Sequence, residues 1–170
     1  VMLSSDVPPR SGLGSSSALA VSLVNVVSKL KGKQIKNSEI ADIAHNIERN
    51  YLNWPMGKQD EHISAIGGFK KLVFSKKGVK AINVNLSKKS FNELQDNLLL
   101  FFISSRTSTK ILPSQINRLN KKDPILLQSL DSVKQLANSM YDQLQKSDIL
   151  GFGELLNKGW LAKKKFSTNV

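Results

Sequence analysis

Residues 9–18, Pro-Arg-Ser-Gly-Leu-Gly-Ser-Ser-Ser-Ala, constrain the fold more than any other stretch, because a long apolar run follows them at once. Gly12 and Gly14 permit backbone angles and close approaches that a Cβ atom would prevent. The serines can cap a helix and leave free N–H groups at the positive end of its dipole, where an anion is stabilised. The stretch predicts a phosphate-binding loop that opens a central, buried helix from about Ser15 to Lys31.

Two common nucleotide-binding motifs are excluded by the residues around these glycines. No Gly-Lys-Ser or Gly-Lys-Thr follows them, so the stretch is not a Walker A loop. It also lacks the third glycine of the dinucleotide-binding fingerprint. For the Gly-x-Gly-Ser pattern on its own, a glycine turn followed by an ordinary serine cap is the alternative interpretation.

The composition is that of a globular protein. The chain has 170 residues, of which 40% are hydrophobic and 22% charged. No stretch is long and apolar enough to cross a membrane, and no basic segment precedes an apolar one at the start, so we expect a cytoplasmic protein without a membrane partner. The absence of cysteine excludes disulfides, thiolate metal sites and cysteine catalysis within these residues.

The net charge of +12 suggests a nucleic-acid partner as one hypothesis. The arginines that would read phosphates and bases are few, however, and the lysines are scattered with no interleaved aromatic residues. We therefore expect no nucleic-acid partner. A lysine-rich, solvated surface explains the positive charge. The electrostatic field of that charge would favour the binding of a phosphorylated substrate.

The pattern of apolar residues and turns predicts both helices and strands. The first half of the chain is expected to contain the end of a strand at residues 1–3, the helix from residue 15 and a second helix capped by residue 37 or 38. A hairpin should follow over residues 69–85, with its turn at 76–78, and then a strand over 98–103 that is buried on both faces. Helices should begin at residue 123 and at residue 147 or 148.

Glu48 falls on the apolar face of the second predicted helix, seven residues after Ala41 and four after Ala44. A buried carboxylate is costly unless a cation or hydrogen bonds accompany it. Three interpretations are open: an ion pair with a lysine or Arg49, a position at the wet edge of the apolar stripe, or a ligand of Mg²⁺.

Asp60 lies near the start of a short helix, because Pro55 and Gly57 interrupt the chain just before it. The dipole of that helix keeps a carboxylate there ionised, and a capping role alone explains the residue. No metal-ligand spacing joins the two histidines, His45 and His62, so we expect each to be hydrogen-bonded or exposed.

The loop resembles the ATP-binding motif of the GHMP kinases, the superfamily of galactokinase, homoserine kinase and mevalonate kinase: a proline, then Gly-Leu-Gly-Ser-Ser-x-Ala leading into an apolar helix. That resemblance implies that ATP is bound by the residues of the motif, Pro9, Gly12, Leu13, Gly14, Ser15, Ser16, Ser17 and Ala18. In these kinases a helix glutamate is followed, about a dozen residues on, by an aspartate that faces the substrate hydroxyl. Glu48 and Asp60 have this spacing, which implies Mg²⁺ on Ser16 and Glu48 and a catalytic Asp60.

Within the superfamily, residues 57–60, 65–69 and 98–101 look most like the D-glycero-D-manno-heptose 7-phosphate kinases and their fucokinase-like relatives. The implied acceptor is a sugar or sugar phosphate, contacted by Lys58, Gln59 and Arg106. Two departures affect this region. Met56 stands where glycine is common, and Glu61-His62 replaces a more usual Gln-Tyr.

The motifs that the superfamily carries near its two ends are not found in this sequence. We therefore expect an internal piece of a longer kinase, with a two-domain α+β GHMP kinase fold incomplete at both ends. Residues 1–88 would be the later part of the N-terminal ATP-binding domain, and residues 89–170 the earlier part of the C-terminal domain.

The function implied by the resemblance is transfer of the ATP γ-phosphoryl group to a sugar hydroxyl. The alternative is a non-catalytic fragment or degenerate relative that binds nucleotide or a partner without turnover. The sequence predicts no oligomeric state.

Overall fold

The computed structural model describes residues 2–8, 11–102 and 111–166, and these residues form two compact units. The first contains the described residues up to Asn83 together with Phe102, and the second contains residues 84–101 and 111–166. The predicted assignment of residues 1–88 and 89–170 to two kinase domains stays a prediction, because a compact unit does not by itself identify a kinase domain.

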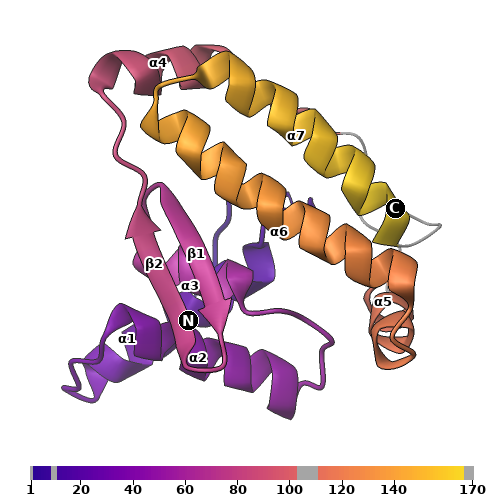
Figure 1. The fold of residues 1–170 in the computed structure, drawn as a ribbon. Coiled ribbons are helices and arrows are strands. Elements are labelled where there is room, and N and C mark those ends of the chain that lie inside the picture. Colours follow the sequence, from indigo (N-terminus) through magenta and orange to yellow (C-terminus); the bar gives the residue numbers. More distant parts are fainter. Residues whose placement is uncertain (1, 9–10, 103–110, 167–170) are drawn as a thin grey trace. The chain divides into compact units, whose positions relative to one another are not determined.

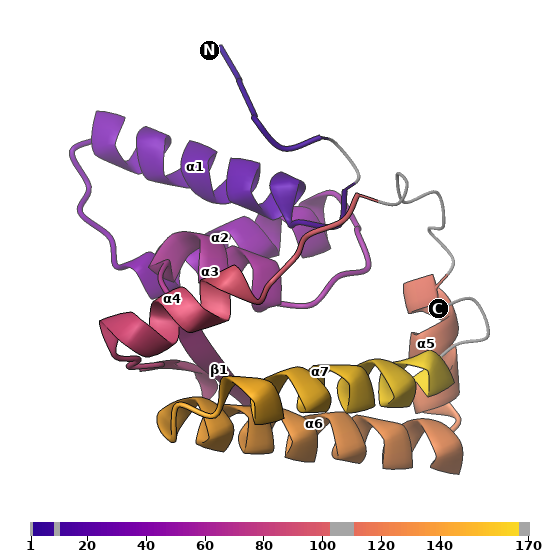
Figure 2. The same ribbon diagram turned by 90° about the horizontal axis from the view of Figure 1, so that it is seen from above.

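Three helices that contact one another in pairs build the first unit (Figure 1 and Figure 2). They are α1 (Ser15–Leu30), α2 (Asn37–Asn46) and α3 (Gln59–Ile66). Aliphatic side chains from all three elements meet in its core: Val21, Val24, Ile40 and Ala44, with Ala20, Ile35 and Ala65 packed against them.

Helix α1 has the predicted bounds but not the predicted burial. Only Ser17, Val21 and Val24 are buried along it, whereas Val26 and Leu30 on other faces are exposed. In the described part of the chain, α2 and α3 cover one side of this helix, so apolar residues elsewhere on it keep contact with solvent. The predicted cap of α2 is also wrong, since Lys36 occupies that position without a side-chain hydrogen bond.

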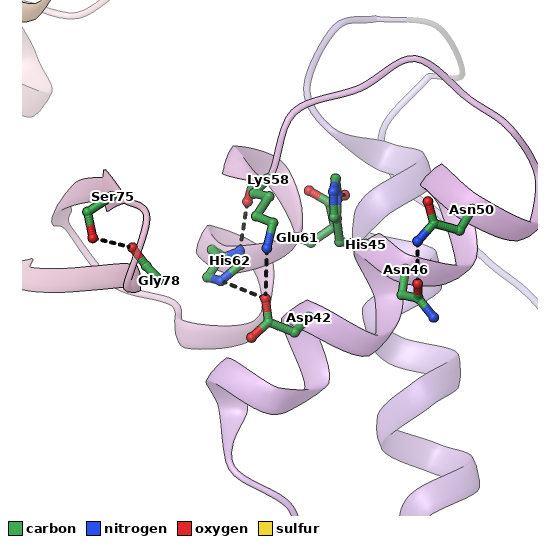
Figure 3. A network of polar contacts seen from close by, with 9 residues as sticks. All are labelled: Asp42, His45, Asn46, Asn50, Lys58, Glu61, His62, Ser75 and Gly78. Carbon is green, nitrogen blue, oxygen red and sulfur yellow. Dashed lines mark hydrogen bonds and ion pairs between the residues drawn. The ribbon is translucent and has the colours of Figure 1, made fainter.

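The predicted hairpin is confirmed. Strands β1 (Lys70–Ser75) and β2 (Gly78–Asn83) pair antiparallel, with Lys70 opposite Asn83 and Ser75 opposite Gly78. The Ser75 hydroxyl donates a hydrogen bond to the Gly78 carbonyl at 3.1 Å (Figure 3). Gly78 has a φ of 122°, which a residue with a side chain rarely adopts, so this glycine makes the tight turn possible.

The two other predicted strands are wrong for the residues that the structure describes. Residues 2–8 and 98–102 form no strand, and the side chains from Leu98 to Phe102 are 52–81% exposed. A strand needs a hydrogen-bonding neighbour, and in the described residues β1 and β2 pair only with each other. The apolar run at 98–102 therefore stays extended without joining a sheet.

The second unit is helical. It contains α4 (Lys88–Asp96), α5 (Ile111–Asn120), α6 (Pro124–Gln145) and α7 (Ile149–Lys163), followed by a short 3₁₀ turn at Lys164–Phe166. Helices α6 and α7 lie side by side and are joined by three residues (Figure 1). Asp123 and Asp148 accept hydrogen bonds from the first turns of α6 and α7, as the sequence predicts.

Among residues 2–8, 11–102 and 111–166, every helix is too short or too polar to cross a bilayer.

Arg118, on α5, connects the start of α6 to the 3₁₀ turn that follows α7. Its Nε atom donates to Asp123 Oδ2 at 2.7 Å, and its Nη1 atom donates to the carbonyls of Lys165 and Phe166 at 3.1 and 2.7 Å. The hydrogen bond from Arg118 lowers the pKa of Asp123 below its ordinary value of 3.8.

Replacement of Asp123 by asparagine tests this ion pair. Because the folded pKa is lowered, ionised Asp123 contributes stability above pH 4 that is lost as the pH falls through the folded value. We expect Asp123→Asn to be less stable than the natural chain at pH 7, and the gap to narrow below about pH 4. Urea unfolding at a series of pH values measures both effects; a gap that is the same at pH 3 and pH 7 would contradict the role of the pair.

Candidate active site

The loop before α1 leaves backbone amides open to a ligand. Gly12 and Gly14 have φ angles of 80° and 72°, and Gly14 is the N-cap of α1. The predicted serine cap is wrong, because Ser15 to Ser17 are already helical and Gly14 has no side chain to accept a bond. The first-turn N–H groups therefore have no side-chain cap and lie at the positive end of the dipole, which suits a phosphate. Pro9 lies outside the described residues.

Asp60 lies beside Gly14. A Cβ atom at Gly14 would lie 3.4 Å from both Cβ and Cγ of Asp60, and 3.5 Å from its Oδ2. Asp60 is the second residue of α3, its side chain is exposed, and its carboxylate makes no hydrogen bond or ion pair with another described residue. The structure thus brings the predicted catalytic acid directly against the predicted ATP loop.

Glu48 lies in a widened helical turn that follows α2. Residues Ile47–Tyr51 form a π-helical turn in which the Leu52 amide bonds to the Ile47 carbonyl at 3.0 Å. Such turns add a residue to the helical circumference and change the direction of the side chains, and they are frequent at functional sites. Here Glu48 is 2% exposed, and within the described part of the chain neither of its oxygens has a hydrogen-bond partner. The wet-edge alternative is therefore wrong, and among the described residues Glu48 forms no ion pair with a lysine or with Arg49.

Serine hydroxyls near the start of α1 share this lack of partners. The hydroxyls of Ser11, Ser15 and Ser17 are buried, and none of them has a hydrogen-bond partner among residues 2–8, 11–102 and 111–166. Burial raises the pKa of Glu48, and the charge of Glu61 adds to that rise. The Ser17 hydroxyl lies near enough to oppose the rise, although it does not reach hydrogen-bond geometry with the carboxylate. Ser16 also lowers the pKa of Glu48, although Ser16 itself is exposed.

These unpaired oxygens fit a metal that phosphates help to hold. Mg²⁺ takes oxygen ligands, and in nucleotide sites it is usually bound by one or two protein groups together with water and phosphate oxygens. Glu48 and the serine hydroxyls supply such groups. Across the described residues no cluster of three His, Asp or Glu side chains could hold a metal without other ligands.

A cavity of about 620 Å³ lies beside this site and runs along α1 from Ser16 to Lys31. Its walls are α1, α2 and the π-helical turn, and they are mainly apolar. The aliphatic and aromatic residues that line it are Leu19, Ala20, Leu23, Val24, Val27, Ile35, Ile43, Ile47, Leu52 and Trp54. The cavity accounts for several of the apolar side chains of α1 that the core does not cover.

The predicted substrate residues lie in different surroundings. The Nζ atom of Lys58 is 3.4 Å from Asp42 Oδ1 (Figure 3), and Gln59 is exposed at the first position of α3. Arg106 lies outside the described residues. His62 is buried, and its Nδ1 donates to the Lys58 carbonyl at 2.8 Å, which confirms the expectation of a hydrogen-bonded histidine.

One buried pair was not predicted. Glu61 has no exposed surface, and its Oε1 accepts a hydrogen bond from His45 Nδ1 at 2.8 Å (Figure 3). The substitution of Glu61-His62 for Gln-Tyr was the sequence signal at this position. It did not identify the partner, which lies sixteen residues earlier on α2.

Known proteins have sequences similar to that of this chain. Residues 1–68 match the family model of the GHMP kinases N-terminal domain. A D-glycero-alpha-D-manno-heptose 7-phosphate kinase from Campylobacter jejuni is 30% identical over 168 residues, which cover 98% of this chain and 49% of that protein. This chain belongs to the GHMP kinase superfamily.

Other GHMP kinases match at comparable levels. Mevalonate kinase from Pyrococcus abyssi is 31% identical over 92% of this chain and 45% of its own length. The crystal structure of a D-glycero-D-manno-heptose 1-phosphate kinase from Bacteroides thetaiotaomicron superposes with a TM-score of 0.74 and 25% identity, over 94% of this chain and 46% of that one. The α+β GHMP kinase fold is therefore confirmed, and the chain spans about half the length of the relatives it matches.

Because the carboxylate of Glu48 is buried without a partner among the described residues, we expect its replacement by a neutral side chain to stabilise the folded protein. Because the folded pKa of Glu48 is raised, its contribution is unfavourable once the pH exceeds the ordinary value of 4.5, and stability falls as the pH rises toward the folded value. We expect Glu48→Gln to be more stable than the natural chain at pH 7 without Mg²⁺, with the difference vanishing near pH 4. Thermal unfolding in a chelating buffer measures this, and a variant less stable at pH 7 would show that Glu48 has a partner in the metal-free protein.

Proposed function

We propose that the intact protein transfers the γ-phosphoryl group of ATP to a hydroxyl group of a sugar or sugar phosphate. The observation that carries this proposal is the position of Asp60 beside Gly14. An acid beside a phosphate-binding loop can face a hydroxyl group that approaches the terminal phosphate. In this proposal residues 1–88 belong to the ATP-binding domain and residues 89–170 to the second domain.

The phosphate-binding part of the site consists of backbone and hydroxyl groups. The N–H groups of the loop and of the first turn of α1, from Gly12 to Ala18, would hold the phosphates. Ser16 and Glu48 would hold Mg²⁺, which when bound neutralises charge on the transferring phosphoryl group. Glu48 suits this role because its buried oxygens have no partner in the described part of the chain.

Asp60 would orient the acceptor hydroxyl or accept its proton. Phosphoryl transfer depends mostly on positioning and on stabilisation of charge, so a carboxylate of low basicity is sufficient. The exposed carboxylate of Asp60, which has no partner among the described residues, is available to a substrate.

The acceptor that we favour is a sugar phosphate. The names of two similar proteins, the heptose 7-phosphate and heptose 1-phosphate kinases, specify phosphorylated sugars, whereas the mevalonate kinases act on a different alcohol. A phosphate on the acceptor needs a cation away from the ATP loop. Arg106 is the residue we infer for this, since Lys58 is already paired with Asp42; Gln59, next to Asp60, would contact the sugar.

The decisive variant is Asp60→Asn in the intact protein. It keeps the size of the side chain and removes its charge, so we expect turnover to fall by about 10²- to 10⁴-fold while the affinity for MgATP changes little. Turnover is measured as ADP release with a panel of sugar phosphates, neutral hexoses and mevalonate, and ATP affinity by calorimetry.

Three outcomes of that assay are informative. Undiminished turnover by Asp60→Asn would remove Asp60 from the mechanism. Faster transfer to a neutral hexose or to mevalonate than to every sugar phosphate would overturn the proposed acceptor. MgATP binding by the natural protein without transfer to any alcohol would favour the non-catalytic alternative.

A further inference from the structure

The buried hydrogen bond between His45 and Glu61 connects the two segments that carry the candidate acids. His45 lies on α2, three residues before Glu48, and Glu61 lies on α3, directly after Asp60. The bond from His45 Nδ1 to Glu61 Oε1 is 2.8 Å long, and the Glu61 side chain has no exposed surface. The pair therefore spans from the Glu48 segment to the Asp60 segment inside the protein (Figure 3).

The chain between these segments does not hold them in place by regular structure. After the π-helical turn, residues 52–58 form neither helix nor strand, and this stretch contains Pro55 and Gly57. Helix α3 has only eight residues, and a helix of that length is not stable without tertiary contacts. The orientation of its first turn, and so of Asp60, depends on what that turn contacts.

The polar contacts that join α2 to the start of α3 differ in their surroundings. Asp42 Oδ1 is 3.4 Å from Lys58 Nζ and 3.7 Å from His62 Nε2 (Figure 3), and because the Asp42 side chain is 58% exposed, water and salt weaken both contacts. The bond of His45 to Glu61 is shielded from solvent, where a hydrogen bond is stronger and its loss leaves a buried group without a partner. The buried contact is the one that can hold α3 in register.

We propose that His45 and Glu61 form a positioning pair that holds Asp60 and Glu48 at the separation needed for phosphoryl transfer. The pair acts through other residues, since Glu61 is fully buried and cannot touch a substrate. This inference rests on the proposed function, because it assigns the pair to the same site.

The charge of Glu61 supports the same inference. Glu61 lies close enough to Glu48 for its negative charge to raise the pKa of that residue, and its Oε2 has no hydrogen-bond partner in the described part of the chain. Two neighbouring carboxylates repel each other, and the bond from His45 fixes one of them. The pair thus constrains both the position of α3 and the charge beside Glu48.

The test compares variants of the intact protein: His45→Ala, Glu61→Ala, the double variant and Glu61→Gln. We expect each alanine variant to lower kcat at saturating MgATP by at least about tenfold, because small misplacements of reacting groups are costly, with the KM for ATP changed by less than about threefold. The double variant should be no slower than the slower single variant, since both remove one interaction. Glu61→Gln keeps an oxygen that accepts from His45 and should retain most of the activity.

Asp42→Asn is the matched control, because it removes the charge of the exposed partner of Lys58 and His62 while keeping an oxygen that can accept hydrogen bonds from them, so it should leave kcat unchanged. A second measurement does not depend on turnover: amide hydrogen exchange in residues 59–66 should become faster in both alanine variants and stay unchanged in Asp42→Asn. Unchanged exchange in the alanine variants, or additive losses of kcat in the double variant, would overturn the positioning role. If the natural protein transfers no phosphoryl group, the proposed function fails, while the exchange rates still decide whether the pair holds α3.

Discussion

The left-handed backbone of Gly14 is the constraint on which the candidate site depends. With a φ of 72° and no side chain, this residue starts α1 without a side-chain cap, and the amides of the first turn stay available. Asp60 lies beside this residue, since a Cβ atom built on Gly14 would be in van der Waals contact with the Asp60 side chain. The conformation of Gly14 therefore explains the anion-binding helix terminus, and the position of α3 places an acid beside it.

Glu48 lowers the stability of the fold at the candidate site. A carboxylate that is 2% exposed and lacks partners in the described residues destabilises the fold, and its raised pKa reports that cost. Ionisable groups in such surroundings are concentrated at functional sites, because a ligand supplies the missing interaction. Glu48 lies in the π-helical turn at Ile47–Tyr51, a type of turn that is frequent at functional sites.

Local signals in the sequence predicted the local structure well. The bounds of α1, the turn of the hairpin at Gly78 and the starts of α6 and α7 each depend on a few neighbouring residues, and the structure confirms them. The proximity of Glu48 and Asp60 to the start of α1 was available only through the resemblance to GHMP kinases. Their roles as metal ligand and catalytic acid stay predictions.

Features that depend on distant parts of the chain were not predictable in this way. The apolar run at Leu98–Phe102 has the composition of a buried strand, but strand formation requires a neighbour that the run itself does not specify. The prediction that α1 is buried on all sides was wrong for a similar reason, since apolar composition does not say how many sides of a helix are covered. The bond between His45 and Glu61 joins positions sixteen apart across an irregular loop, so no periodic pattern indicates it.

Binding of Mn²⁺ in place of Mg²⁺, followed by electron paramagnetic resonance of the intact protein with ATP, tests most directly whether the start of α1 and Glu48 form a metal–nucleotide site. The account predicts that ATP strengthens Mn²⁺ binding to the natural protein, that Glu48→Gln weakens the ternary complex by at least about tenfold, and that the exposed control Glu154→Gln does not. Equal Mn²⁺ affinity in the Glu48→Gln variant and the natural protein would contradict it.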